Sequence, residues 1–419
     1  MARTLTPVDV YAVMNLLVKE ATGQDGSITV VDTSTFISAG ETVLATGTEN
    51  VLNSLGLVIG RTFMATRPYK AKMAIINAIN TGAYTARMRK ISFYSRDAQP
   101  SGAHNTQLFT NLEMGFDNGQ NPSGGVAQST ESMWLQNQPV PLEVNFGGHS
   151  VWQDSTTIYE DALKTAFRSE NEFAQFMAGV MTEKGNDIES QKEAFNRALV
   201  VNHIAGVIDM ASDMPGSAIE LVAAYNARYG TSYTGSDLRS TYLASFLAFF
   251  VETVKLTSDQ MTHRSKRFHW SPAKTVAGTS YSLLRHTPKD RQKLMLYNPF
   301  FIQAQAQVLP GIFNPEYLRI ENFEPVDFWQ DELVPYNINI TPAIIDTSTG
   351  EIDQGAAVND IYVLGMLFDE DALMIDYQLE DALSTPVEAR KRYRNLWWTF
   401  SKNAIADYTE NVAVFYMAS

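Results

Sequence analysis

The strongest constraint on the fold is one stretch in which apolar residues keep a helical spacing from residue 173 to residue 205. Ser169, with Glu172 three positions later, forms the capping box that marks a helix start. A continuous helix of roughly 36 residues would be about 50 Å long at 1.5 Å per residue. This length predicts a spine that runs across a whole domain. Four of its apolar positions are candidates for the domain core: Phe173, Phe176, Met177 and Val180.

Two further helices and a polar arm are expected besides the spine. Thr6 and Pro7 suit the cap and the first position of an N-terminal helix. Residues 23–48 are mostly polar, rich in threonine and interrupted by glycine, so we expect an extended arm there. Another helix is expected to begin at a cap formed by Ser236 and Asp237.

Two strands are expected on either side of a long polar stretch. Residues 86–94 and 140–146 have strand-like patterns, and the chain between them is rich in Gly, Asn, Ser and Gln. A connection of more than 30 residues does not belong to a compact domain core. We therefore expect a projecting hairpin that finds its partners elsewhere. Short mixed strands are expected over 268–363, and two strands, 393–400 and 411–416, are expected to meet near the C-terminal end.

The overall composition excludes several classes of protein. The chain has 419 residues, with 32 basic and 46 acidic side chains and a net charge of −14, which argues against a dedicated nucleic-acid binder. It contains no cysteine, so disulfides, thiolate metal sites and cysteine nucleophiles are excluded. No apolar run approaches the roughly 20 residues of a membrane helix, and the first residues do not resemble a signal peptide. We expect a soluble protein that has no contact with a membrane.

The charge is segregated along the chain. Residues 51–96 hold eight basic side chains and no acid, residues 264–293 hold eight against one acid, and residues 316–381 hold sixteen acids against one arginine. Such blocks repel themselves unless opposite charge lies nearby, within the chain, on another copy or on a nucleic acid. Separate solvated faces and single-strand nucleic-acid binding remain alternatives to subunit contact. The candidates for contact between subunits are Arg87, Arg89, Lys90 and Arg96.

A search for catalytic and metal-binding patterns gives no positive evidence. Phosphate-binding loops and the Gly-x-Ser-x-Gly elbow are absent, and the six histidines lack metal-ligand spacing. The acids of residues 369–371 lack the pattern of a calcium loop, so we expect a solvated acidic face. Trp397 and Trp398 suggest core packing more than sugar stacking. We therefore predict no catalytic residue, no metal, no cofactor and no enzymatic activity.

The order of these parts resembles a known family. An N-terminal arm, a long hairpin with a glycine-rich tip, a spine helix, a mixed central region and a C-terminal return strand occur in that order. This order is similar to the major capsid protein of tailed bacteriophages, the Johnson fold, and closest to coat proteins of small short-tailed phages with protein-primed genomes. The stretch from Thr157 to Phe167 resembles that family's hairpin-to-spine junction, and residues 411–415 resemble its final strand.

The resemblance implies an α+β fold with four parts. Residues 1–60 would form the N-terminal arm and residues 61–150 the extended loop, which lies over a neighbouring subunit. The peripheral domain would combine residues 151–230 and 371–419, and residues 231–370 would form the axial domain. The predicted function is a major capsid protein that forms pentamers and hexamers of itself in an icosahedral or prolate shell around packaged viral dsDNA. We predict that Arg87, Arg89 and Lys90 lie against acidic surface of an adjacent copy, from residues 316–381.

The resemblance also implies partners and a location. A separate scaffolding protein, a portal protein and packaged dsDNA, held by non-specific contacts, would be the other partners. The protein would be found in the virion capsid after assembly in the host bacterial cytoplasm. Two alternatives stay open at this point: the shell of an encapsulin-like cargo compartment, which shares the fold, and a phage tail or receptor-binding protein.

Overall fold

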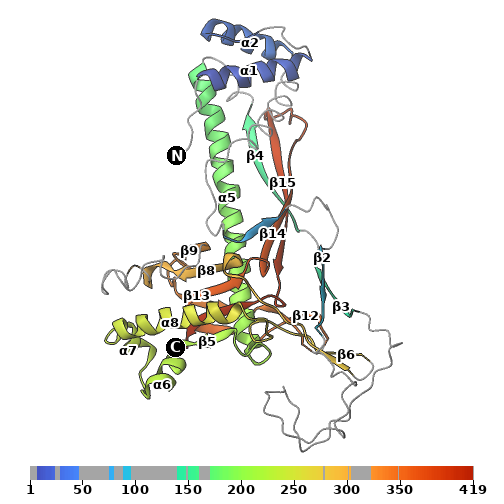
Figure 1. The fold of residues 1–419 in the computed structure, drawn as a ribbon. Helices are drawn as coiled ribbons and strands as arrows, with labels where there is room; N and C mark the ends of the chain where they lie inside the picture. Colours follow the sequence, from blue (N-terminus) through green and yellow to red (C-terminus); the bar gives the residue numbers. More distant parts are fainter. Residues whose placement is uncertain are drawn as a thin grey trace, which may run out of the picture.

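A single long helix, α5 (Glu170–Asp209), connects two β-sheets (Figure 1). The computed structural model describes residues 7–23, 29–46, 75–79, 88–95, 139–147, 150–159, 170–276, 279–300, 302, 322–347 and 349–418. Forty residues at 1.5 Å each make α5 about 60 Å long, which confirms the predicted spine. Ser169 of the predicted capping box lies outside the described residues. A short 3-10 turn, η2 (Met210–Ser212), ends the spine.

The upper sheet in Figure 1 has four strands in the order β1 (Asn77–Ile79), β14 (Leu373–Ser384), β15 (Tyr393–Ala406) and β4 (Ser150–Tyr159). β1 is parallel to β14, and the other neighbours are antiparallel. Side chains alternate between the two faces of a strand, so adjacent tryptophans of β15 cannot share one environment. Trp398 is buried, as predicted, but Trp397 is 38% exposed, so its assignment to the core was wrong.

The lower sheet has six strands around β13 (Val358–Asp369). β16 (Val412–Met417) and then β5 (Ala218–Glu220) lie on one side of β13. β8 (Gln292–Tyr297), then β9 (Asn322–Val326), and β10 (Asn337–Ile340) lie on the other. A Cβ on Gly365 would lie 2.6 Å from the carbonyl oxygen of Met295, so glycine allows β8 to pair closely with β13.

The pairing of the last strand crosses an expected domain boundary. β15 and β16 follow each other in the chain but belong to different sheets, so the predicted meeting of two terminal strands was wrong. β16 pairs with β13 over Tyr362 to Phe368, within the region expected to be axial. The return segment 371–419 therefore divides between the two sheets.

Three helices cover the lower sheet: α6 (Leu221–Tyr229), α7 (Gly235–Arg239) and α8 (Leu243–Met261). The predicted helix start was two residues late, because Thr234 is the cap and forms a capping box with Asp237. The predicted single helix is also divided after Arg239. α8 packs on the sheet through Phe250, whose ring lies 5.8 Å from that of Phe415.

The N-terminal helices lie at the far end of α5 (Figure 1). α1 (Pro7–Thr22) is confirmed, but the predicted extended arm contains a second helix, α2 (Thr33–Ala45). The Asp32 carboxylate accepts a 2.8 Å hydrogen bond from the Thr35 amide and caps this helix. Phe36, Ala39 and Val43 follow at helical spacing and are fully buried. Tertiary packing thus overrides the polar composition.

The predicted hairpin strands are confirmed. β2 (Met88–Phe93) pairs antiparallel with β3 (Pro141–Phe146) in a two-stranded sheet that stands beside the lower part of the molecule (Figure 1). Two smaller hairpins are formed by β6 (Lys274–Val276) with β7 (Thr279–Tyr281), and by β11 (Ala343–Ile345) with β12 (Ile352–Gln354). A 3-10 turn, η3 (Lys289–Arg291), precedes β8.

Candidate functional site

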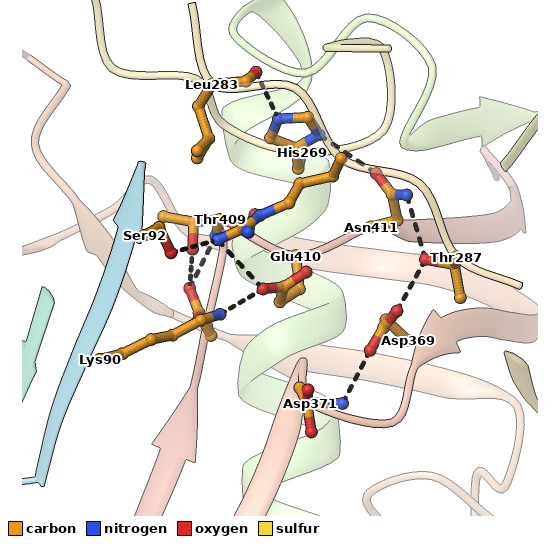
Figure 2. A network of polar contacts seen from close by, with 12 residues as sticks. Lys90, Ser92, His269, Leu283, Thr287, Asp369, Asp371, Thr409, Glu410 and Asn411 are labelled. Carbon is orange, nitrogen blue, oxygen red and sulfur yellow. Dashed lines mark hydrogen bonds and ion pairs between the residues drawn. The ribbon is translucent and has the colours of Figure 1, made fainter. Parts of the chain in front are cut away.

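A cluster of charges ties the hairpin to residues 407–411, the junction between β15 and β16. Lys90 of β2 lies 2.5 Å from a carboxylate oxygen of Asp407 and also donates to Glu410 (Figure 2). Both carboxylates are buried, and Lys90 is largely covered. Because β2 alternates, Lys90 and Ser92 face this junction, while the residue between them, Ile91, faces away.

Arg285 adds a second cation to the cluster. Its guanidinium donates to Ser92 Oγ at 2.7 Å and to the Thr409 carbonyl at 3.1 Å, and it lies 3.2 Å from Glu410. Burial raises the pKa of Glu410, and the charges of Lys90 and Arg285 oppose that shift. The two cations thus compensate two buried carboxylates, which would be costly to leave alone.

The network continues through hydrogen bonds to Asp369, at the end of β13 in the lower sheet. His269 lies 3.0 Å from the Leu283 carbonyl and 3.1 Å from the Asn411 side chain (Figure 2). The Asn411 amide donates to Thr287 Oγ1 at 3.1 Å, and that hydroxyl donates to Asp369 at 2.8 Å. Burial lowers the pKa of His269 to about 4, which keeps its ring neutral at pH 7.

This arrangement is suited to positioning rather than to chemistry. Its charged groups are paired, and it fixes the direction of the hairpin relative to both sheets. Asp407 and Glu410 were missed from the sequence, although two acids three positions apart in a turn between apolar strands were an available indication. Among the described residues, no three His, Asp or Glu side chains are grouped to hold a metal ion.

The structure separates the predicted contact residues. Arg89 faces outward and lies 3.2 Å from Glu143 across the hairpin, with both side chains about half exposed. Lys90 instead pairs with acids of its own chain, so its predicted contact with acids of residues 316–381 on an adjacent copy is corrected. Arg87 and Arg96 lie outside the described residues.

The outward face of the hairpin is apolar. Ile91 and Phe93 alternate with the buried positions of β2 and are 51% and 61% exposed. Large apolar side chains exposed on one strand face are typical of contact with another molecule. This face carries Arg89 at one end, so it combines apolar area with one of the predicted basic contacts.

The acids of residues 369–371 are not the solvated face that was predicted. They surround Arg291, whose Nε lies 2.9 Å from Glu370 and whose Nη2 contacts Asp371. Part of the segregated charge is therefore compensated within the chain, between the second basic block and the acidic block. The four core candidates of the spine, Phe173, Phe176, Met177 and Val180, belong to α5, but their side chains lie outside the described part of the chain.

A hollow of about 490 Å³ lies between α5 and the segment after β9. Its lining includes Ala194, Arg197, Phe328 and Trp329. The Arg197 guanidinium stacks over the Phe328 ring, 3.6 Å from its centroid, and pairs with Glu193 at 2.8 Å. The contact between Arg197 and Phe328 joins α5 to the segment after β9. Within the described ranges, no helix has the length and hydropathy needed to span a membrane.

Several solved phage structures are similar in fold. One, a capsid structure of Staphylococcus phage Andhra, has 11% identity and a TM-score of 0.48, over 84% of this chain and 85% of that one. A structure of the head fiber and an inner core protein of native bacteriophage P68 gives 9% identity and a TM-score of 0.47, over 83% and 84%. A capsid structure of the cyanophage P-SCSP1u has 13% identity and a TM-score of 0.40, over 82% of this chain and 86% of that one. No curated protein matches the chain.

A family model carries the assignment. The model for the Phi29-like phage major capsid protein matches residues 135–416, about two thirds of the chain, from β3 to β16. This match confirms the predicted resemblance to tailed-phage coat proteins and their α+β capsid fold, and it favours a viral shell over a cargo compartment. The chain belongs to the Phi29-like phage major capsid protein family.

Proposed function

We propose that this major capsid protein forms pentamers and hexamers that close into an icosahedral or prolate shell around packaged viral dsDNA. Membership in the capsid family, which assembles as many copies of one chain, supports this proposal most directly. The role is structural rather than enzymatic. Assembly would take place in the host bacterial cytoplasm, with a scaffolding protein, a portal protein and DNA as further partners.

The hairpin is the part of the chain best suited to reach a neighbouring copy. Its inner face is held by Lys90 and Arg285, whereas its outer face leaves Ile91 and Phe93 exposed. A shell subunit needs such surface, which buries little area in one copy and much area in the assembly. We assign residues 61–150 to this extended loop and residues 1–60 to the arm. The lower sheet, including β16, would belong to the axial region.

Electron microscopy of the purified protein, with and without a candidate scaffold, tests this function. Closed shells or capsomer rings hundreds of ångströms across are expected from the wild-type chain. The double variant Ile91→Asp/Phe93→Asp should lose shells while keeping the circular dichroism spectrum of the subunit. Leu256→Asp on α8, which changes a similarly exposed apolar residue, is the matched control and should assemble.

One result would contradict the shell function, and another would contradict only the role of the hairpin in subunit contact. Small monodisperse wild-type particles, despite scaffold and varied salt, would count against a shell protein. Normal shells from the hairpin variant would agree with the shell function but would show that Ile91 and Phe93 are not needed for contact between subunits.

A further inference from the structure

An exposed acidic and apolar turn projects from the lower sheet. We call residues 331–334 the acidic tip. Leu333 is 89% exposed, Val334 is also exposed, and the exposed acids Asp331 and Glu332 precede them. Neither acid has an ion pair in the part of the chain that the structure describes. Covering such an exposed aliphatic side chain with another surface lowers the free energy of the complex, because apolar area is removed from water.

The acidic tip is held rigidly at its base. Trp329 is fully buried, and its indole Nε1 donates to the Val363 carbonyl at 2.9 Å. The Trp329 amide donates to the Pro335 carbonyl at 2.9 Å, which closes the turn. Gln330 exchanges hydrogen bonds with Asn339, at 2.7 Å and 2.9 Å. A turn fixed in this way loses little conformational entropy on binding.

A basic surface lies elsewhere on the same chain. The basic strip consists of four exposed side chains: Arg264, Lys266, Arg267 and Lys274. Across the described ranges, none of them forms an ion pair. Phe268 anchors the strip: its ring is buried, and its carbonyl accepts a 2.9 Å hydrogen bond from the Val412 amide. Val276 adds exposed apolar area beside Lys274.

The two surfaces cannot neutralise each other within one molecule. The tip is attached at Val363, and the strip is attached at Val412, which pairs with Phe368. These positions are five residues apart on β13, or about 17 Å. The tip lies between β9 and β10, on one side of β13, whereas Val412 belongs to β16, on the other side. Charges separated by more than the Debye length of about 8 Å are largely screened.

We propose that the acidic tip of one copy docks on the basic strip of the next copy within a ring. This inference rests on the proposed function and names one of its contacts. Different patches on the two partners make a heterologous contact, which closes into rings when the rotation allows. The complementary charges set the register, and Leu333 supplies the apolar anchor. Unpaired cations would also suit phosphate, but the unpaired acids and the exposed leucine of the tip favour a second copy.

Charge reversal and its rescue test the contact. The tip variant Asp331→Lys/Glu332→Lys and the strip variant Lys266→Glu/Arg267→Glu should each lower shell yield at least tenfold under matched conditions. The quadruple variant, which restores opposite charges in exchanged positions, should regain most of that yield. Glu351→Lys/Asp353→Lys is the control, because these exposed acids also flank an exposed aliphatic side chain, Ile352, and should leave the yield unchanged.

The absence of cysteine permits an independent measurement. Leu333→Cys and Ala273→Cys chains, mixed and oxidised, should give a cross-linked heterodimer that neither chain forms alone.

Several outcomes would overturn the inference: unchanged yield in either reversal, a quadruple variant that folds but stays unassembled, or strip-variant shells that form normally and lose only DNA. If wild-type protein forms no shells at all, the proposed function fails instead. Sedimentation of the same variants as small oligomers would then still decide the tip–strip contact.

Discussion

Lys90 and Arg89 are neighbours in β2, yet their ion pairs differ in burial. Lys90 contacts two buried carboxylates, whereas Arg89 and Glu143 are about half exposed. Removing one partner of a buried pair leaves charge uncompensated, so Lys90→Met should lower the free energy of unfolding by about 3 kcal/mol. Arg89→Met should lower it by less than about 1 kcal/mol. Urea denaturation of the unassembled subunit measures both, and equal effects would refute the structural role of Lys90.

His203 makes the stability of the subunit depend on pH. It is fully buried on α5 and stacks on Tyr408, with 4.7 Å between ring centroids. Neither ring nitrogen has a hydrogen-bond partner in the described part of the chain. Burial lowers its pKa from 6.5 to about 4, with Asp407 opposing the shift. The folded state therefore binds a proton less readily than the unfolded state.

The stability contributed by neutral His203 is complete above pH 6.5 and is lost as the pH falls toward 4, by up to about 3 kcal/mol. His203→Phe should keep the ring packing and reduce this acid loss, measured by urea denaturation at pH 7, 6 and 5. His269, whose pKa is also lowered to about 4, should remain as a cause of the decrease in unfolding free energy with falling pH in this variant. A variant that loses stability as steeply as the wild type would contradict this assignment.

At the scale of elements, the largest buried side chain of α2 is Phe36. Phe36 is fully buried, whereas its neighbour Ile37 is 39% exposed. Phe36→Ala should weaken the packing of α2 by about 3–5 kcal/mol. Hydrogen exchange of the α2 amides should accelerate strongly while exchange in the two sheets stays unchanged. Ile37→Ala is the control and should leave the α2 amides protected. Equal exchange in the two variants would show that α2 forms without the Phe36 ring.

The sequence predicts correctly those elements whose structure is determined by the pattern of their own residues. The spine follows from a long periodic pattern and the hairpin strands from short strand-like stretches, and both are present. α2 was missed because its apolar face consists of only a few residues among threonines and serines, and packing decides its state. Trp397 was misplaced because the alternation of β15, not hydrophobicity, decides which tryptophan is covered.

At the scale of the whole molecule, sequence patterns could not show which strands pair. Lys90 finds its partners 317 and 320 residues away, and no local pattern encodes such a distance. The charge blocks were visible in the sequence, but their compensation was not. Arg291 meets acids of its own chain, whereas the basic strip and the acidic tip remain unpaired in the described residues. The family resemblance predicts the architecture, whereas the pairing of Lys90 with Asp407 and Glu410 is evident only in the folded chain.

The place of β16 also bears on the timing of synthesis. This strand follows every other described element in the chain, yet it lies inside the lower sheet, between β13 and β5. Ribosomes add about 5–20 residues per second, so α5 is available well before β16 completes the lower sheet. A nascent chain therefore cannot present its completed lower sheet to a neighbour. Association that needs the completed lower sheet must wait until β16 has emerged from the ribosome.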